Sequence, residues 1–249
     1  MKIVSIMWNS YVPALREVAA AEGIDCIAYP IRALDDDPIE REKAIADLRG
    51  ADAALLYWTT NRVWDELERE IREIGTHVPL ICVGYDPSRW ALSTVPNEVV
   101  TTCYSYLTYN GTENLRNLLL YIAQEIGGRD TTPALPSALP WQGIYHPDAP
   151  GPFFTPEEYL AWYPVKNRPF VGLLLSRVAW VTGNCAIEDD LIRSLEEEGL
   201  AVIPAFTYAV RDDTIGSFGM ADVIQEYFLP PRGPGISAVI KCISFMLGA

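Results

Sequence analysis

The sequence predicts an α/β protein made of two successive doubly wound parallel-sheet units, joined by a Pro-rich aromatic segment. Short apolar runs alternate with amphipathic helical segments over residues 1–126, and the alternation resumes after residue 169. Between them, Arg129 to Pro169 hold nine of the nineteen prolines. Such alternation is typical of parallel sheets covered on both faces. The expected boundaries are 1–128 for the first unit with trailing helices, 129–168 for the connecting segment and 169–249 for the second unit.

The first unit is expected to contain four strands separated by helices. The strands are the short apolar runs at residues 2–7, 25–29, 53–57 and 80–83. The helices follow the first three strands and have apolar stripes or a charged amphipathic pattern, at residues 12–22, 38–49 and 62–74. Right-handed crossovers in this order give an open sheet of flavodoxin-like type.

Two apolar helical segments, 98–109 and 112–126, are expected to follow the fourth strand. Thr112 is the expected N-cap of the second, because a threonine hydroxyl can accept a hydrogen bond from the first helical turn. In the charged helix, Pro38 occupies the first turn, and the three aspartates before it are expected to form a solvated helix entry.

The proline density of residues 129–169 predicts an extended connection that contains neither a helix nor a central strand. The same segment carries seven aromatic residues, which a disordered linker would lack. We therefore expect it to pack against a folded unit.

The second unit is expected to begin with a strand at 170–175 and a helix at 186–198 that ends before Gly199. A second strand is expected at 200–204. Further apolar segments follow, a helix at 219–228 and residues 236–247. With only two clear strands, this unit is expected to be incomplete.

Composition limits the function. The chain carries 33 acidic and 19 basic side chains, a formal charge of −14 at pH 7. This argues against binding to nucleic acid or to an anionic membrane, because both require basic side chains. The five cysteines are scattered, which argues against a disulfide framework and a zinc site. The absence of a signal-peptide pattern and of any run of 18 apolar residues predicts a cytoplasmic protein.

His146 is the foremost candidate for a catalytic residue, because imidazole is a common metal ligand and proton carrier near neutral pH. It lies between aromatic residues, and Trp141 and Tyr145 are suited to stacking on a flat ring. Asp148 would add a carboxylate. The structural alternative is that His146 satisfies backbone carbonyls in a segment where proline prevents regular hydrogen bonding.

Arg177, Asn184 and Glu188 are further candidates at the junction of a strand and a helix. Doubly wound sheets bind ligands at the carboxyl ends of their strands, where Arg177 is expected. Its guanidinium could pair with carboxylates of a ligand. Asn184 could cap the following helix, and Glu188 with the two aspartates after it would also be favourable in the first helical turn without any ligand.

Several catalytic motifs are absent. The sequence has no G-x-x-x-x-G-K-[ST] loop for ATP and no G-x-S-x-G nucleophile motif. Residues 8–11, after the first strand, contain no glycine and do not suit a dinucleotide pyrophosphate. The aromatic and hydroxyl residues at 57–60 are expected either to line a pocket at the same edge or to cover the core.

Two stretches resemble the large subunit of the cobaltochelatase and magnesium chelatase family. One reads W-Q-G-I-Y-H-P-D-A-P at 141–150, followed by F-F-T-P-E-E-Y-L-A-W-Y. The other reads V-G-L-L-L-S-R-x-x-W-V-T-G-N at 171–184, followed by I-E-D-D-L-I-R-S-L-E-E-E-G-L-A-V-I-P-A-F. Residues 141–150 look more like the cobalt type than the magnesium type. The first 126 residues match more loosely.

The resemblance implies the N-terminal part of a subunit that binds a tetrapyrrole, here a corrin precursor, for ATP-dependent Co²⁺ insertion in cobalamin biosynthesis. Cobalt is then a substrate ion, and ATP is hydrolysed on partner subunits of the AAA+ class. In this interpretation Trp141, Tyr145 and Arg177 contact the ring, and His146 takes a proton or passes the metal.

Three other functions stay open. The first is a non-catalytic module that binds a small ligand or docks a partner, and the second is a magnesium chelatase-type porphyrin subunit. The third is a stand-alone enzyme that uses the carboxylates at 188–190, although no nucleophile or cofactor motif supports it. Because family members are several times longer, this chain alone is expected to be inactive.

Overall fold

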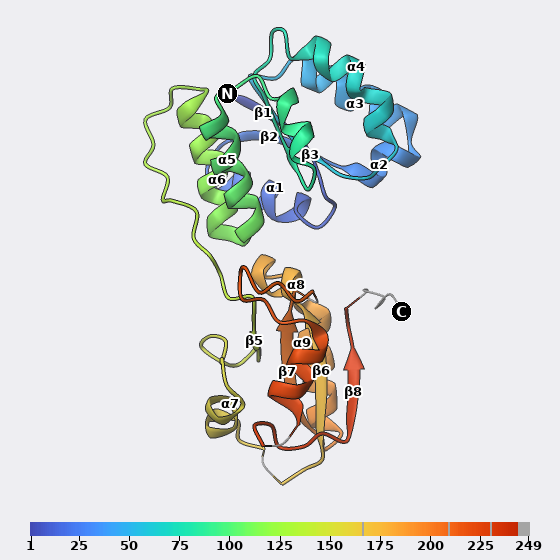
Figure 1. Ribbon diagram of the computed structural model, residues 1–249, viewed down its shortest axis with the longest axis vertical. Helices are drawn as coiled ribbons and strands as arrows, with labels where there is room; N and C mark the ends of the chain where they lie inside the picture. Colours follow the sequence, from blue (N-terminus) through green and yellow to red (C-terminus); the bar gives the residue numbers. More distant parts are fainter. Residues whose placement is uncertain (166, 209, 230, 244–249) are drawn as a thin grey trace. The chain divides into compact units, whose positions relative to one another are not determined.

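The computed structural model describes residues 1–165, 167–208, 210–229 and 231–243. The chain divides into two compact units, Met1–Ala138 and Leu139–Ala249. Each unit contains one four-stranded sheet with helices packed against it (Figure 1). The α/β class and the two successive parallel-sheet units are confirmed. The division between the units falls inside the segment expected as a connection, at 129–168, and residues 139–168 of that segment belong to the second unit.

The sheet of the first unit is entirely parallel, in the order β2-β1-β3-β4. Its strands are β1 (Lys2–Met7), β2 (Asp25–Pro30), β3 (Ala53–Trp58) and β4 (Leu80–Gly84). The two central strands and β4 are almost wholly buried, as continuous apolar runs predict. This is the doubly wound order expected from the alternation of strands and helices.

Helices cover both faces of this sheet. One face carries α1 (Val12–Ala21), α5 (Asn97–Tyr109) and α6 (Thr112–Glu125). The other carries α2 (Ile31–Asp36), α3 (Pro38–Arg49) and α4 (Val63–Ile74). Alternate residues of β1 serve the two cores, since Ile3 and Met7 pack with the first set while Val4 and Ile6 pack with the second.

Helix ends in this unit differ from the expectation at one point. Thr112 is the first residue of α6, and the N-cap is Gly111, whose φ of 88° favours glycine. The aspartates before Pro38 divide between two roles. Asp37 caps α3, accepting hydrogen bonds from Ile39 N and Glu40 N, whereas Asp35 lies in α2, a helix that the sequence did not indicate.

Gly84 closes β4 at a point where no side chain fits. Its φ is 147°, and a Cβ atom there would lie 2.2 Å from the carbonyl oxygen of Trp58 on the neighbouring strand. Trp90 lies in the 3₁₀ helix η1 (Pro87–Leu92), and its indole N–H donates to the Gly84 carbonyl at 3.0 Å. The glycine therefore lets the two strand ends approach closely.

The sheet of the second unit has the order β5-β7-β6-β8. Its strands are β5 (Gln142–Ile144), β6 (Phe170–Ser176), β7 (Ala201–Thr207) and β8 (Ala238–Lys241). β6 pairs in parallel with β7 and β8, whereas β5 runs antiparallel to β7 at the edge. The two strands that the sequence did not indicate, β5 and β8, contain three and four residues, too few to show a pattern.

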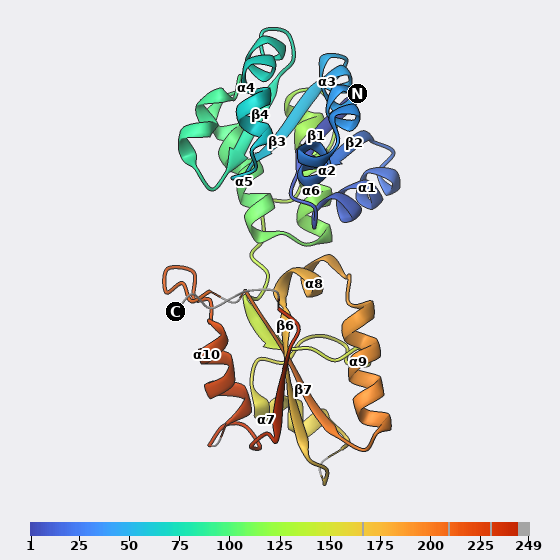
Figure 2. The same ribbon diagram turned by 90° about the vertical axis from the view of Figure 1, so that its right-hand side faces the viewer.

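Helices pack on both sides of the second sheet, and Figure 2 shows α9 and α10 on opposite sides of the strands. The helices are α7 (Pro156–Trp162), α8 (Arg177–Thr182), α9 (Ala186–Glu197) and α10 (Met220–Val223). The last continues as a π-helical turn, η2 (Ile224–Phe228), where one uninterrupted helix was expected. Residues 244–247 of the expected apolar segment lie outside the described residues.

The expectation that no helix forms among residues 129–169 is wrong. Proline lacks an N–H donor, but Pro156 occupies the first turn of α7, where that donor has no intrahelical partner. Thr155 and Glu158 complete a capping box at the same end, because each side chain accepts from the backbone of the other residue. Most aromatic residues of this segment pack in or against the core of the second unit, as expected, whereas Phe154 is exposed.

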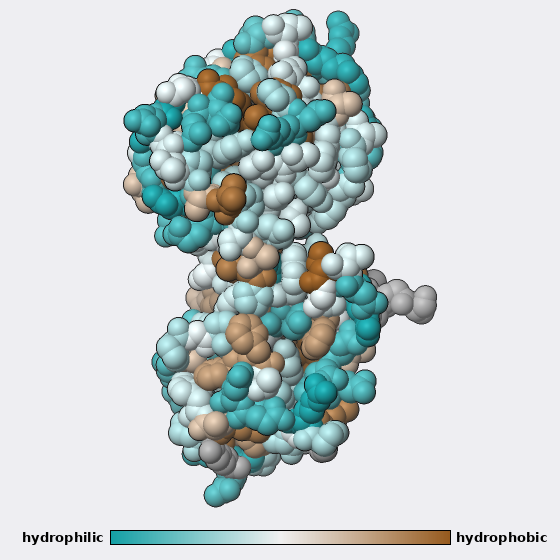
Figure 3. Space-filling view, turned by 60° about the vertical axis from the view of Figure 1, so that its left-hand side comes forward, coloured by the Kyte–Doolittle hydropathy of each residue, from teal (hydrophilic) through white to brown (hydrophobic). Residues whose placement is uncertain are grey.

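On the face drawn in Figure 3, hydrophobic residues lie as separate brown patches among hydrophilic ones. Among the described residues, no helix combines the length and the apolar character needed to cross a membrane.

Candidate functional site

Arg177 lies at the carboxyl end of β6, where the sequence predicted it. It is the first residue of α8, and only 2% of its side chain surface is exposed. Its Nε donates to the carbonyl of Pro140 at 2.8 Å, and Nη2 donates to that of Leu139 at 3.1 Å. The guanidinium thus holds the chain segment that precedes β5.

Trp141 packs on this guanidinium. The centre of its ring lies 4.2 Å from the Arg177 Cζ atom, which is a cation–π geometry. Tyr208 follows β7 and meets the Trp141 ring edge-on, with the ring centres 5.7 Å apart. Gln142 pairs with Thr207, the last residue of β7. The side chains of Trp141, Arg177 and Tyr208 therefore lie together at the carboxyl ends of β6 and β7.

Tyr145 faces the first turn of α9. Its hydroxyl donates to Asp189 Oδ1 at 2.8 Å. Burial and this hydrogen bond raise the pKa of Tyr145, and burial raises the pKa of Cys185 to about 12, so both side chains stay protonated at neutral pH. Glu188 is half-buried in the same turn. Tyr145 and Cys185 are thus neutral groups beside the carboxylates of Glu188 and Asp189 in the first turn of α9.

Asn184 is exposed, and it does not cap α9, although the sequence allowed it as the cap. The N-cap is Cys185, with no hydrogen bond from its side chain to the helix. Gly183 precedes Asn184 with a φ of 69° and ends α8 in a left-handed conformation. The glycine bends the chain between the two helices, and this places Asn184 one residue before the cap.

His146 is buried, with 4% of its surface exposed. The rings of Tyr159, Trp162 and Tyr163 surround its imidazole at centre distances of 5.1–6.5 Å. The backbone N–H of Asp148 donates to Nδ1 at 3.2 Å. Because Nδ1 accepts this hydrogen bond, Nε2 carries the proton of the neutral ring.

The Nε2 atom of His146 faces a carboxylate. Glu196 Oε1 lies 3.3 Å away and also accepts a hydrogen bond from the Tyr163 hydroxyl at 2.5 Å. Burial and the bond to Glu196 raise the pKa of Tyr163, which therefore remains a donor. Both nitrogens of His146 thus have partners within the second unit, and these are an N–H group and a carboxylate instead of the backbone carbonyls considered from the sequence.

Asp148 points away from this buried group. Its side chain is 60% exposed and pairs with Arg193 Nη2 on α9 at 3.0 Å. Its contribution near His146 is made by the backbone N–H. An exposed pair of this kind contributes little to stability.

The predicted site residues form two groups. β5 runs antiparallel to β7, so Trp141, just before β5, lies near the end of β7. Tyr145 N donates to Pro204 O, and His146, one residue further on, lies toward the beginning of β7. Trp141 and Arg177 therefore share the carboxyl edge of the sheet, whereas His146 lies toward its opposite edge.

The residues that hold these side chains in place carry no signal that singled them out in the sequence. Tyr208, Tyr163 and Glu196 each complete one of the groups. Asp189 was expected as a carboxylate of the first helical turn or of a stand-alone enzyme, and not as the partner of Tyr145. Glu196 belongs to a run of three glutamates at the end of a helix, where the pattern indicates a solvated surface. No spacing signal distinguishes it from its neighbours.

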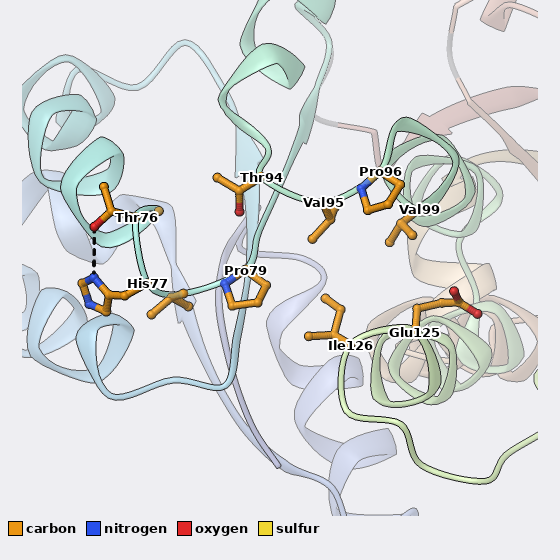
Figure 4. A pocket seen from close by; sticks show the side chains of 11 residues that line it. Thr76, His77, Pro79, Thr94, Val95, Pro96, Val99, Glu125 and Ile126 are labelled. Carbon is orange, nitrogen blue, oxygen red and sulfur yellow. Dashed lines mark hydrogen bonds between the residues drawn. The ribbon is translucent and has the colours of Figure 1, made fainter.

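The other histidine, His77, lies in the first unit beside a cavity of about 490 Å³. Figure 4 shows this cavity, with His77 and Glu125 at opposite ends and a bond of 3.3 Å between Thr76 Oγ1 and His77 Nδ1. The residues before β4 border it, at the amino edge of the sheet. The two histidines thus belong to different units. In the described part of the chain, no group of three or more His, Cys, Asp or Glu residues could hold a metal ion.

The chain matches a known family. The family described as CobN/Magnesium Chelatase matches residues 104–249, which make up more than half of the chain. The matched range includes all seven predicted site residues and both groups described above.

Individual proteins are similar over different lengths. An uncharacterized protein of Methanocaldococcus jannaschii is 30% identical over 253 residues, which span 100% of this chain and 19% of that relative. The magnesium-chelatase subunit ChlH of Oryza sativa is 30% identical over 151 residues, 54% of this chain and 10% of that relative.

A solved structure is similar in fold. The catalytic subunit of cobaltochelatase from Mycobacterium tuberculosis matches with a TM-score of 0.57 and 17% identity, over 87% of this chain and 17% of that one. The chain therefore spans less than a fifth of the length of each of these three proteins.

Proposed function

Since the chain belongs to the CobN/magnesium chelatase family, we propose that it is the N-terminal part of a subunit that binds a tetrapyrrole while a metal ion is inserted. The observation that carries this proposal is the family match over residues 104–249, which contain both stretches on which the resemblance was based. The metal is a substrate here. Metal insertion also requires the rest of the subunit, and AAA+ partner subunits hydrolyse the ATP.

The carboxyl edge of the second sheet is the surface that we assign to the ring. Trp141 offers a half-buried aromatic face, and Tyr208 beside it is 38% exposed. Aromatic rings stack on flat ligands, and this edge is where doubly wound sheets bind them. The Arg177 guanidinium packs against the Trp141 ring. It can bind carboxylates of the tetrapyrrole only if its hydrogen bonds to the carbonyls of Leu139 and Pro140 are broken.

Tyr145, Asn184 and Glu188 extend this surface along the start of α9. The phenol of Tyr145, whose proton is donated to Asp189, can accept a hydrogen bond, the exposed amide of Asn184 both donates and accepts, and Glu188 accepts. Such groups suit the polar periphery of a corrin precursor. The Asp148 carboxylate is exposed and pairs with Arg193 of α9, so it would contact only the outer rim of the tetrapyrrole.

His146 is proposed to take a proton from the ring or to pass the metal, and its geometry defines how. A proton can be taken up only at Nδ1, where the hydrogen bond from the Asp148 backbone would have to break, and the Glu196 carboxylate facing Nε2 would then stabilise the imidazolium. Because the His146 imidazole is buried, a tetrapyrrole would have to displace one of the surrounding aromatic side chains to reach it. Metal insertion by the complete complex tests this role, and unchanged insertion with His146→Ala would remove it.

A titration tests the binding proposal. The chain is titrated with hydrogenobyrinic acid a,c-diamide and, separately, with protoporphyrin, and ring absorbance and tryptophan fluorescence are recorded. Saturable binding of the corrin precursor with weakened affinity in Trp141→Phe supports the proposed surface and cobalt as the metal. Trp8→Phe is the matched control, because Trp8 is also a partly exposed tryptophan but lies in the first unit.

Two results would favour other functions. Binding of protoporphyrin alone favours a magnesium-type subunit, which the similarity to the rice subunit supports. Binding of neither ring favours a non-catalytic module that docks a partner or another ligand. That module is favoured by the contacts of Arg177 and His146, because both side chains are hydrogen-bonded to backbone groups of the second unit itself.

A further inference from the structure

Trp180 lies in α8, three residues after Arg177, and its side chain is half-buried. Its ring stacks on the ring of Phe206, with the ring centres 4.1 Å apart and an angle of 11° between the planes. Phe206 belongs to β7 and is fully buried. One face of the Trp180 ring therefore covers the core of the second unit, and its exposed surface lies on the opposite face or at the ring edge.

A glycine on the edge strand makes room for this stack. Gly143 lies directly opposite Phe206 in the antiparallel pairing of β5 with β7. A Cβ atom at Gly143 would lie 2.9 Å from Phe206 Cζ, closer than two carbon atoms pack. The rings of Phe206 and Trp180 thus occupy the side of the sheet toward which a side chain at position 143 would project.

Trp141 and Tyr145 belong to the same side of the sheet. Each lies two positions from Gly143, and alternate residues of a strand project toward the same face. Their contacts agree, since Trp141 packs on Arg177 of α8 and the Tyr145 hydroxyl donates to the first turn of α9. Trp180 therefore lies next to Trp141 and Tyr145 in space, above the gap that the glycine leaves.

The indole N–H of Trp180 is a free donor at this surface. Among the described residues it has no hydrogen-bond partner, and it is not buried. By contrast, the Tyr145 hydroxyl donates to Asp189, and the Arg177 guanidinium donates to two backbone carbonyls. A ligand can accept a hydrogen bond from Trp180 without breaking any bond within the described part of the protein.

We propose that Trp180 is a further binding residue for the tetrapyrrole, and that its indole N–H donates to a peripheral carboxylate or amide oxygen of the macrocycle. This inference rests on the proposed function. Trp141 offers the stacking surface, whereas Glu188 and Asp189 at the start of α9 repel a carboxylate. A donor on α8 and carboxylates on α9 together determine which edge of the macrocycle faces each helix.

NMR on the complete chain tests this role directly. The chain is labelled with ¹⁵N-tryptophan and titrated with hydrogenobyrinic acid a,c-diamide, and the Trp180 indole N–H signal is assigned by its absence from the spectrum of Trp180→Phe. We expect a saturable shift of this signal, with the same midpoint as the change in macrocycle absorbance. The indole N–H of Trp90, which donates to the Gly84 carbonyl in the first unit, is the internal control and should not shift.

Trp180→Phe separates the donor from the aromatic stack. Phenylalanine keeps a ring that can pack on Phe206 but lacks the N–H group, so affinity for the corrin precursor should fall about fivefold, the effect of one hydrogen bond. Trp8→Phe, in the first unit, should bind as the wild type does. The wild-type NMR shift decides the question even if Trp180→Phe proves unstable.

Two results would overturn the role of Trp180 alone. These are saturable binding of the macrocycle without a shift of the Trp180 signal, and wild-type affinity in Trp180→Phe. In either case, weakened binding in Trp141→Phe would leave the tetrapyrrole surface itself supported. An absence of macrocycle binding to the wild-type chain would overturn both the role of Trp180 and the assigned surface.

Discussion

The guanidinium of Arg177 lies 4.2 Å from the centre of the Trp141 ring and donates to the two backbone carbonyls just before it. One buried side chain thereby joins the end of β6 to the entry of the edge strand β5. The side chain that the sequence assigned to a ligand is therefore also a structural element of the proposed binding surface.

Replacement of Arg177 should destabilise the second unit. Arg177→Met leaves two carbonyls without their donors and should cost about 2 kcal/mol in the free energy of unfolding, measured by urea denaturation. Arg177→Lys should recover only part of this, because a lysine cannot make the same planar pair of bonds. Arg193→Gln breaks an exposed ion pair and should change stability by less than about 1 kcal/mol. Equal effects at the two arginines would contradict the buried role.

Replacement of His146 should also lower stability. His146→Ala removes a ring packed among three aromatic side chains and should cost about 2 to 3 kcal/mol in thermal or urea unfolding. His77→Ala is the control, since His77 is exposed and should tolerate the change. A neutral effect at His146 would show that the imidazole is not held as the geometry indicates.

Gly84→Ala should strongly destabilise the first unit. The new methyl group would meet the Trp58 carbonyl at 2.2 Å, and the positive φ of 147° adds strain. We expect a loss of about 3 kcal/mol or more, read from the urea midpoint. The matched substitution Gly50→Ala meets no atom closer than 3.8 Å and has no positive φ, so it should be nearly neutral. Similar midpoints for the two variants would refute the close approach.

The decrease in the free energy of unfolding at low pH should depend on Asp47. A hydrogen bond from the Tyr29 hydroxyl, followed by the contact with Lys2, lowers the pKa of Asp47 in the folded state. A lowered folded pKa stabilises the fold above the unfolded value, and this stabilisation is lost as the pH falls. The difference in unfolding free energy between wild type and Asp47→Asn should thus be constant above about pH 4 and shrink below it.

A control for Asp47 is Asp130→Asn, an exposed carboxylate for which the described residues show no ion pair. Its stability difference from wild type should show no such decrease on acidification. A difference between wild type and Asp47→Asn that stayed constant down to pH 2 would mean that the carboxyl titrates normally in the folded protein.

The strands and helices of the first unit were predictable because each has a local cause. Continuous apolar runs predicted β1, β3 and β4, and the apolar spacing along α4 predicted its buried face. Asp37 and Pro38 mark the start of α3 in the sequence itself. Elements of three or four residues, such as β5 and β8, lack room for a pattern and form only because β7 and β6 offer hydrogen bonds.

The sequence by itself determined the α/β class, the succession of two units and the family, since each depends on patterns or motifs many residues long. Only the tertiary structure decided which candidate residues meet. His146 and Trp141 are five positions apart, but the antiparallel pairing of β5 with β7 directs them toward opposite edges of the sheet. The partner of His146 is Glu196, fifty residues away and indistinguishable in sequence from two neighbouring glutamates. Long-range pairing fixes such contacts, because the register of strands and helices, not local spacing, brings side chains together.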